Sequence, residues 1–230
     1  MTIHSIADLH LDSGGKPMDV FGASWDDHED RIFANWRALV KGEDLVLIPG
    51  DISWAMQLNE AKRYLDMIGE LPGTKLILRG NHDYWWSSLT RVRAALPDGM
   101  YALQNDSFAF QGVAIAGTRG WTLPQPDSPP EDIKIYDREL IRLEMSLKDA
   151  RRRNPDAPLI AMMHYPPLTP DNAVTGFTGL LQSYGAETCV YGHLHGAALR
   201  GAARGEFGGI RYIQVSSDGI GFAPVPIYTN

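Results

Sequence analysis

Short apolar runs rich in β-branched residues alternate with amphipathic segments along this chain, and this alternation limits the folds that it can form. The seven runs are residues 3–9, 45–49, 75–78, 113–116, 159–163, 188–191 and 210–215. Apolar side chains recur at helical spacing between some of them, within residues 32–40, 58–68 and 136–147. Strands that alternate with such helices are typical of sheets covered by helices, so we expect an α/β protein.

The glycine-rich stretch between Leu199 and Ile210 favours a hairpin late in the chain. A hairpin makes part of the last third antiparallel, so a mixed sheet is a better expectation than a purely parallel one. The sequence has no internal repeat, low-complexity tract or linker that would divide it. We therefore expect residues 1–230 to form a single domain.

Composition excludes several classes of function. The formal net charge of -7 argues against extended nucleic-acid binding through a basic face. No apolar stretch reaches the roughly 18 residues that a membrane span needs, and no secretory signal is visible at the start. We therefore expect a cytoplasmic protein with no membrane partner. The sequence indicates no oligomeric state.

Acidic, amide and histidine side chains lie in five clusters, each at or just after an apolar run. The clusters contain Asp8 and His10; Asp51; Asn81, His82 and Asp83; His164; and His193 and His195. Open α/β sheets bind ligands at the carboxyl ends of their strands. Residues far apart in the sequence are therefore expected to meet in one crevice. A single histidine after a strand is more often structural, but five of the seven histidines fall in these clusters.

The donor types indicate a pair of metal ions. Carboxylate, amide and imidazole ligands without sulfur suit divalent Mn, Fe, Co, Ni or Zn, and we favour Mn. Asp51 directly follows Gly50, and a carboxylate after such a turn can bridge two ions. Two ions about 3.5 to 4 Å apart can hold a hydroxide and clamp a phosphoryl group. The lone cysteine, Cys189, lies in an apolar run and is expected to fill a strand interior, with a catalytic thiol as the lesser alternative.

His82 need not bind metal, although it adjoins Asn81. A histidine that is protonated and oriented by a carboxylate can donate a proton to a leaving oxygen or stabilise charge there. Asp83 is the nearest carboxylate for that purpose.

In their order, the five clusters resemble the motifs of the calcineurin-like metallophosphoesterase superfamily: D-x-H, G-D, G-N-H-D/E, H and G-H-x-H. This resemblance implies a sandwich of two mixed sheets flanked by helices. It also implies one metal held by Asp8, His10, Asp51 and His195, and a second held by Asp51, Asn81, His164 and His193. His82 would be the catalytic histidine.

The second motif continues as Gly50-Asp51-Ile52-Ser53-Trp54, without the phosphate-binding arginine of the Ser/Thr protein phosphatases. The chain is more similar to small prokaryotic phosphoesterases. We therefore expect a binuclear metal-dependent hydrolase that acts by attack of a metal-bridging hydroxide on a phosphorylated small molecule. A phosphodiesterase acting on small or nucleotide-like substrates is favoured. The alternatives are a phosphomonoesterase and, less favoured, a non-catalytic metal-binding scaffold.

Several residues around the motifs have two interpretations. The tryptophans at 54, 85, 86 and 121 would either wall a substrate cleft or pack in the core. Arg119 would either reach a substrate phosphate or form a surface salt bridge. The segments 121–131 and 166–179 are long loops, which are often functional. Arg151–Arg153 is expected to be a solvated helix end, and His4 and His28 are expected to be structural or exposed.

Overall fold

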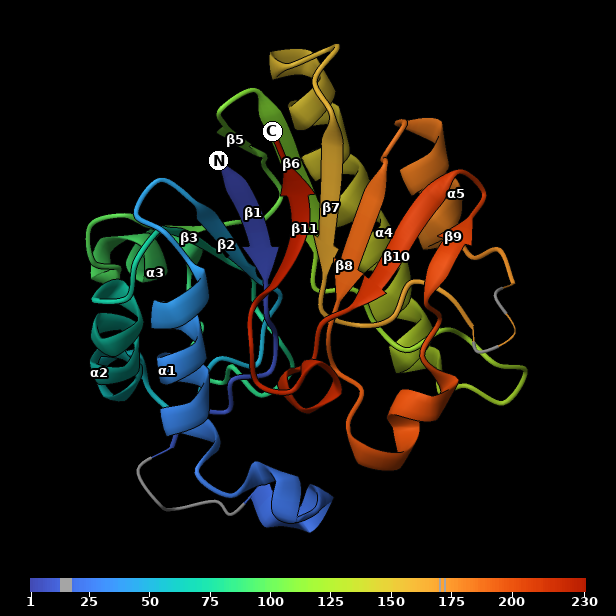
Figure 1. Ribbon diagram of the computed structural model, residues 1–230. Coiled ribbons are helices and arrows are strands. Elements are labelled where there is room, and N and C mark those ends of the chain that lie inside the picture. The colour runs from blue at the N-terminus through green and yellow to red at the C-terminus, as the bar shows by residue number, and fades with distance from the viewer. Residues whose placement is uncertain (13–17, 170, 172) are drawn as a thin grey trace.

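The computed structural model describes residues 1–12, 18–169, 171 and 173–230, which form two β-sheets with helices on their outer sides (Figure 1). The first sheet has the order β11 (Val225–Thr229), β1 (Thr2–Ser5), β2 (Leu45–Ile48), β3 (Thr74–Ile77) and β4 (Met100–Ala102). The second has the order β5 (Phe108–Phe110), β6 (Val113–Thr118), β7 (Leu159–Met163), β8 (Thr188–Tyr191), β10 (Ile210–Gln214) and β9 (Gly205–Phe207).

Both sheets are mixed. β1 to β4 pair in parallel and β11 runs antiparallel to β1. In the second sheet β6, β7, β8 and β10 are parallel, whereas the edge strands β5 and β9 are antiparallel to their neighbours. The expected hairpin is β9–β10, which turns at Gly208 and Gly209, both with positive φ. The predicted fold class, a sandwich of mixed sheets flanked by helices, is confirmed.

The strands are apolar on both faces because each sheet contacts a core on either side. Leu45 and Leu47 of β2 face the layer between the two sheets, while Val46 and Ile48 face the helices outside the first sheet. That outer layer contains α1 (His28–Leu39), α2 (Leu58–Gly69) and α3 (Leu89–Ala95). The second sheet is covered by α4 (Pro130–Arg153) and α5 (Gly176–Ser183).

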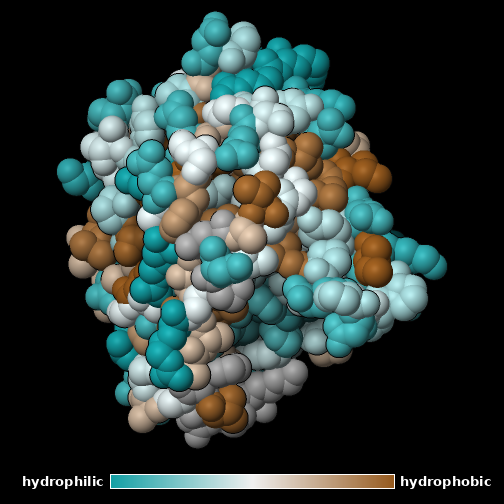
Figure 2. Space-filling model, turned by 90° about the vertical axis from the view of Figure 1, so that its right-hand side faces the viewer, coloured by the Kyte–Doolittle hydropathy of each residue, from teal (hydrophilic) through white to brown (hydrophobic). Residues whose placement is uncertain are grey.

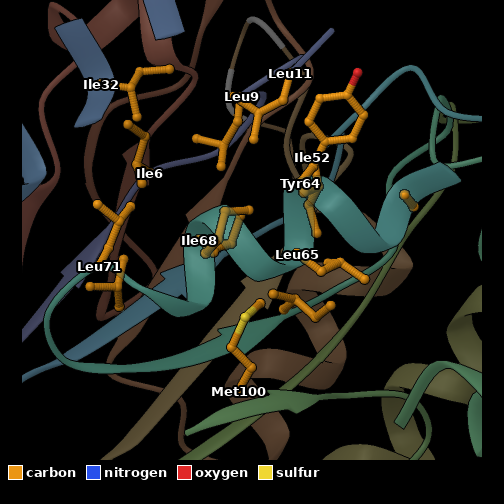
Figure 3. Close-up of a cluster of buried hydrophobic side chains, with 14 of the residues drawn as sticks. Ile6, Leu9, Leu11, Ile32, Ile52, Tyr64, Leu65, Ile68, Leu71 and Met100 are labelled. Carbon is orange, nitrogen blue, oxygen red and sulfur yellow. The ribbon is translucent and has the colours of Figure 1, made fainter. Parts of the chain in front are cut away.

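Helix α2 shows how the sequence forms this outer layer. Its first turn is closed by a capping box in which Gln57 and Glu60 each bind the other's backbone amide. Along the helix, apolar residues three or four apart form one buried stripe. The stripe belongs to a larger cluster of buried hydrophobic side chains on the outer side of the first sheet. Figure 3 shows part of this cluster, with labelled members Ile6, Leu9, Leu11, Ile32, Ile52, Tyr64, Leu65, Ile68, Leu71 and Met100.

The first strand is shorter than the apolar run that predicted it. The run covers residues 3–9, but β1 ends at Ser5. Ala7 then leaves the first sheet: its amide donates to Val215 O at 2.8 Å and its carbonyl accepts from Ser217 N at 3.0 Å. The chain therefore crosses from one sheet to the other just before Asp8. Four short strands (β4, β5, β9 and β11) and α3 and α5 lacked a strong enough periodic pattern to be predicted individually.

Within the described residues, four short 3₁₀ helices lie beyond the sheets: Met18–Phe21, Ala23–Trp25, Gly196–Gly201 and Ser217–Ile220. On the face drawn in Figure 2, hydrophobic and hydrophilic residues alternate in small patches. No helix in the described part of the chain has the length and apolar character to cross a membrane.

Candidate metal centre

The predicted ligands meet where the parallel strands of both sheets end, below the sheets in Figure 1. Asp8 and His10 follow β1, Asp51 follows β2, and Asn81 follows β3. From the second sheet, His164 directly follows β7, and His193 and His195 follow β8. This is the convergence that the strand-end placement of the clusters predicted.

An unusual backbone presents several of these side chains. Among the described residues, eight that are not glycine have positive φ, and four of the eight are predicted ligands: Asp8, His10, Asp51 and His193. Such left-handed conformations cost on the order of 1 kcal/mol or more each and persist only where the surroundings enforce them. Here the two loops brace each other, because Asp8 N donates to Gly50 O and His10 N to Asp51 O, each at 3.0 Å.

Two glycines allow these loops to approach. Gly50 has φ +91°, and a Cβ there would lie 2.6 Å from the backbone of Gly80. A Cβ on Gly80 would in turn collide with the side chain and amide of Asp51. Only glycine at both positions lets the β2 and β3 loops meet at this distance, which places Asp51 beside Asn81.

Two overlapping groups of side chains have atoms close enough to share an ion. Asp8, His10 and His195 form one group, and Asp8, Asp51 and His164 the other, with ligand atoms within 4.8 Å of one another in each. Asp51 Oδ2 lies 3.8 Å from His10 Nε2 and 3.5 Å from His164 Nε2, so it reaches both groups. Asn81 Oδ1 lies 2.6 Å from His164 Nε2 and 3.0 Å from His193 Nδ1. All seven predicted ligands are therefore neighbours.

The hydrogen bonds of His164 show that these contacts suit a cation. Its Nδ1 lies 2.9 Å from the carbonyl oxygen of Pro49, an acceptor, so the ring proton is on Nδ1. Its Nε2 then carries a lone pair that faces Asn81 Oδ1, another acceptor. Two lone pairs pointing at each other are unfavourable unless a positive ion lies between them. The donor set therefore fits a divalent metal.

His195 has the same arrangement through a residue that the sequence analysis missed. Its Nδ1 donates to Asp218 Oδ1 at 3.0 Å, and the other oxygen of Asp218 accepts from Gly196 N at 2.8 Å. This leaves Nε2 directed at Asp8 Oδ1, 3.8 Å away, and at His10 Nε2, 3.4 Å away. A carboxylate behind a histidine ligand fixes its tautomer and raises its basicity. Asp218 lies just after β10, the strand-end position that marked the other clusters.

Burial opposes every charge in this cluster. It raises the pKa of Asp8 to about 7 and of Asp51 to about 6, and it lowers the pKa of His164 and of His193 to about 3. Divalent cations would reverse the shift of the carboxylates by stabilising their ionised form, and they bind the neutral imidazoles that burial already favours. The site therefore has the electrostatics of a metal centre.

The family comparison agrees with the geometry. The family model described as calcineurin-like phosphoesterase matches residues 1–197. This chain belongs to the calcineurin-like phosphoesterase family. It is therefore a metal-dependent hydrolase that acts on phosphoester bonds.

A solved structure of a protein of unknown function from Aquifex aeolicus is similar to this phosphoesterase over 98% of the chain and 95% of its own length, with a TM-score of 0.53. The two sequences are 16% identical, so the likeness shows the fold alone. A comparison with curated proteins found none that is significantly similar.

In the phosphoesterase, Asp83 has a different environment from the one that the sequence suggested. It is fully buried, and its oxygens accept hydrogen bonds from the amides of Gly80 at 2.7 Å, Asp51 at 2.9 Å and Ile52 at 2.9 Å. Trp85 Nε1 also donates to it, at 3.1 Å. Asp83 thus holds the β2 and β3 loops together. These hydrogen bonds position Asp51, and the role of Asp83 as the carboxylate that orients His82 stays a prediction.

His82 itself lies at the wall of the site. Its amide donates to Asp51 Oδ1 at 2.8 Å. Its ring centroid lies 4.4 Å from that of Trp54 and 5.8 Å from that of His10. His82 also lines a pocket of about 300 Å³ together with Asp51, His10 and His195. His82 therefore lies at the wall of the pocket that Asp51, His10 and His195 also line.

The four tryptophans separate into two kinds. Trp85 and Trp86 belong to the core, with exposed fractions of 1% and 3%. Trp54 instead stacks on His10, with ring centroids 4.9 Å apart, and lines the metal pocket. Trp121 lines a neighbouring apolar pocket. Tyr165, which the sequence analysis did not single out, packs against His193 with ring centroids 4.1 Å apart and the rings tilted by 34°.

The remaining candidates have structural contacts. Arg119 forms an ion pair with Glu139, 3.8 Å away, but the pair is largely buried, since the Arg119 side chain is 14% exposed and that of Glu139 is 1% exposed. Arg151 is not simply solvated, because its guanidinium donates to the carbonyls of Tyr184, Ala157 and Gly185. His4 is buried beside Asp44, 3.5 Å away.

Cys189 is fully buried in β8, as expected, and burial raises the pKa of its thiol. His28 is half-buried near Trp25 O and His10 O. The two predicted loops are shorter than expected, because α4 begins at Pro130 and α5 at Gly176. Positions 170 and 172 lie outside the described residues.

Proposed function

We propose that this phosphoesterase is a binuclear phosphodiesterase acting on small or nucleotide-like diesters, with a phosphomonoesterase as the second candidate. The observation that carries the proposal is the pair of hollows on either side of the metal pocket. A diester has organic groups on two sides of its phosphorus, whereas a monoester has one. Room on both sides therefore favours a diester.

The larger hollow is apolar. It has a volume of about 420 Å³ and is lined by Trp121, Leu123, Tyr165, Leu168 and other residues of the two long loops and of the segment after β8. It shares His193, Leu194 and Ala198 with the metal pocket, so the two are continuous. An apolar or aromatic ester group bound there would keep its phosphate next to His193.

The second hollow lies on the other side of Trp54. It has a volume of about 330 Å³ and contains Met56, Tyr64, Glu60 and Arg63. Trp54 forms a wall of both this hollow and the metal pocket. Its mixed polar and aromatic lining suits a sugar or base, which also presents both kinds of surface.

Charge also favours a diester. A diester phosphate carries one negative charge and a monoester up to two. Among the described residues that line the metal pocket, none is a lysine or an arginine. The phosphate-binding arginine expected of protein phosphatases is also missing after Asp51. A site without side-chain cations is better matched to the less charged substrate.

We assign the ligands in two sets that share Asp51: Asp8, His10, Asp51 and His195 in one, and Asp51, Asn81, His164 and His193 in the other. When bound, two divalent ions would neutralise phosphate charge and lower the pKa of a water nucleophile. Mn is our first choice, with Fe, Zn, Co and Ni as alternatives for this oxygen and imidazole set.

The chain's own groups complete the chemistry. His82 donates a proton to the departing ester oxygen, since its ring lines the pocket beside Asp51. Asp83 keeps Asp51 in place through the loop amides, and Asp218 keeps His195 in the tautomer that offers Nε2. Trp54 covers His10 and His82 and limits the access of bulk water.

The test compares two chromogenic esters. Protein loaded with Mn should cleave bis-p-nitrophenyl phosphate with a higher kcat/KM than p-nitrophenyl phosphate, and chelation should abolish both activities. Trp121→Ala should raise the KM for the aryl diester without changing metal content, with exposed Asp98→Asn as the control. A higher kcat/KM for the monoester would establish the second candidate instead. Protein that binds no metal and cleaves neither ester would refute both.

A further inference from the structure

A second cavity, distinct from the metal pocket, lies between the ends of β3 and β6 and the helix α4. Its volume is about 240 Å³. Four arginines line it: Arg79 just after β3, Arg119 just after β6, and Arg138 and Arg142 of α4. None of these side chains is a ligand in the metal centre described above.

The cavity has an excess of positive charge. Glu139 is the only carboxylate among its described lining residues, so one negative charge faces four guanidinium groups. Glu139 Oε1 lies 2.9 Å from Arg142, 3.5 Å from Arg138 and 3.8 Å from Arg119. A single carboxylate thus organises three arginines but cannot neutralise them. Its second oxygen is already engaged, because Thr118 Oγ1 donates to it at 2.6 Å.

Two of the guanidinium groups have buried donors with no partner. The Nε atoms of Arg79 and Arg119 are shielded from solvent and make no hydrogen bond. A buried, unpaired donor costs on the order of 1–3 kcal/mol, and more for a charged group. Burial lowers the pKa of Arg119, Glu139 opposes that shift, and Arg79 and Arg138 add to it. A bound anion would accept hydrogen bonds from these donors and would relieve the repulsion between the guanidinium groups.

Solvent reaches the cavity from one side. Arg138 has half of its side chain exposed, and Ser87, which also lines the cavity, is exposed. A small anion can therefore enter without opening the fold. The volume accommodates a tetrahedral oxyanion with several waters, since one water occupies about 30 Å³ in the liquid.

We propose that this cavity binds a phosphoryl group, held by the guanidinium groups of Arg79, Arg119, Arg138 and Arg142 against the buried carboxylate of Glu139. Guanidinium groups match phosphate geometry because they offer parallel N–H donors. Asn105, whose Oδ1 is buried and unpaired beside the cavity, offers its amide nitrogen for the same purpose if the amide is rotated.

The backbone connects this cavity with the metal centre. The carbonyl of Arg119 accepts from the amides of His164 and Tyr165, at 3.1 and 2.9 Å, and Arg79 precedes Asn81 by two residues. A phosphoryl group in the cavity would thus fix two loops that carry metal ligands. It belongs either to a substrate with a second phosphate or to a separate phosphate ion that regulates the enzyme.

Binding can be tested without turnover, so failure of this proposal is distinct from failure of the proposed hydrolysis. The protein is treated with chelator and titrated with inorganic phosphate by calorimetry, so that the metal centre contributes no phosphate site. We expect saturable binding that Arg138→Gln weakens on the order of tenfold. Lys134→Gln removes an exposed cation from the same helix, outside the cavity lining, and should leave the affinity unchanged.

Absence of phosphate binding to the chelated protein, or equal weakening by both substitutions, would overturn the proposal. Arg138→Lys, which retains the positive charge, should restore much of the affinity, and circular dichroism of each variant checks that the fold is retained.

The source of the phosphoryl group is distinguished by kinetics of the Mn-loaded enzyme. If it belongs to the substrate, Arg138→Gln should raise the KM for a nucleoside diphosphate ester but not for bis-p-nitrophenyl phosphate. If it is a separate ion, added phosphate should change the rate on bis-p-nitrophenyl phosphate in the unmodified protein, and this change should be lost in Arg138→Gln.

Discussion

The two sheets contribute to the metal centre in different ways. The first sheet carries the proposed oxygen ligands Asp8, Asp51 and Asn81 together with His10, whereas the second carries three proposed imidazole ligands, His164, His193 and His195. Three of the four strained backbone positions among these ligands belong to the first group. The second group relies mainly on hydrogen bonds behind its rings, as His164 does with Pro49 and His195 with Asp218.

The strain depends on the loop and not on the residue type, because His10 and His193 adopt left-handed conformations just as Asp8 and Asp51 do. In the first sheet, two glycines and the buried Asp83 hold the bent loops in place. In the second sheet, hydrogen bonds behind the rings of His164 and His195 hold each ring in one tautomer. We call the residues that follow strands of the first sheet the first half of the metal centre, and those that follow strands of the second sheet the second half. We expect substitutions in the first half to disrupt the whole centre and substitutions in the second half to disrupt it in part.

The largest effect should come from Asp51→Asn. Asp51 Oδ2 lies near both His10 and His164, so loss of its charge should weaken both ions. We expect kcat/KM to fall on the order of 10⁴-fold, with metal analysis showing well below two ions per chain. Asp66→Asn, at a half-buried position on α2 where Asp66 pairs with Lys62, serves as the control. Retention of two ions by Asp51→Asn would show that this carboxylate does not bridge them.

His82→Ala comes next. The ring lines the pocket, and its proposed task is proton transfer, so turnover should fall on the order of 10³-fold. Metal content should remain that of the unmodified protein, as measured by elemental analysis. Loss of metal would mean that His82 is itself a ligand.

Asp83→Ala tests the bracing of the first half. It removes the acceptor for buried amides of Gly80, Asp51 and Ile52, and we expect the free energy of unfolding to fall by about 3 kcal/mol. Urea denaturation of the metal-free protein measures this loss. Asp98→Ala, on the surface, should change stability by less than about 0.5 kcal/mol. Equal stability of the two variants would contradict the bracing role.

Asp218→Asn tests the second half. It weakens the hydrogen bond that orients His195 while the ligands themselves remain. Such substitutions typically lower metal affinity by about 10- to 100-fold. We expect one ion to be lost at a lower chelator concentration than the other. A competitive titration with chelator measures this difference. If Asp218→Asn weakened the binding of both ions as much as Asp51→Asn does, the two halves of the centre would not differ in the way proposed.

The smallest effect concerns Asp149, on α4 and outside the metal ligands. Burial tends to raise its pKa, but hydrogen bonds from Ser107, Arg152 and Arg153 lower it to about 2. Because the folded pKa lies below the unfolded value, this stability is present above about pH 4 and is lost as the pH falls toward 2. Asp149→Asn should cost about 1 kcal/mol at pH 7 and less at pH 3, with no change in kcat. An equal cost at both pH values would exclude the charge as its origin.

Much of the site was predictable because its ligands follow strands. Asp8 lies at the end of an apolar run and Asp51, Asn81 and His164 lie just beyond one, so the parallel order of β1 to β3 brings the first three to one edge of their sheet, and the packing of the two sheets adds His164. Asp218 satisfies the same rule after β10 but carries no motif that sets it apart from an ordinary turn aspartate. Only its 3.0 Å contact with His195 distinguishes it.

The environment of Asp83 illustrates what the sequence did not determine. Its neighbour along the chain is His82, yet its oxygens bind amides of a loop about thirty residues earlier. The arginine cavity is similar, since Arg79, Arg119 and Arg138 come from three separate elements. Nothing in the local pattern around any one of them indicates the other two.

By itself the sequence determined the fold class, the family and the chemical type of the ligands, because these depend on periodicity and on residue types at strand ends. The tertiary structure decided which carboxylate braces a loop, which one orients a histidine, and where uncompensated arginines gather. Those outcomes depend on distances between segments far apart in the chain, and such distances are set by the packing of the two sheets and their helices.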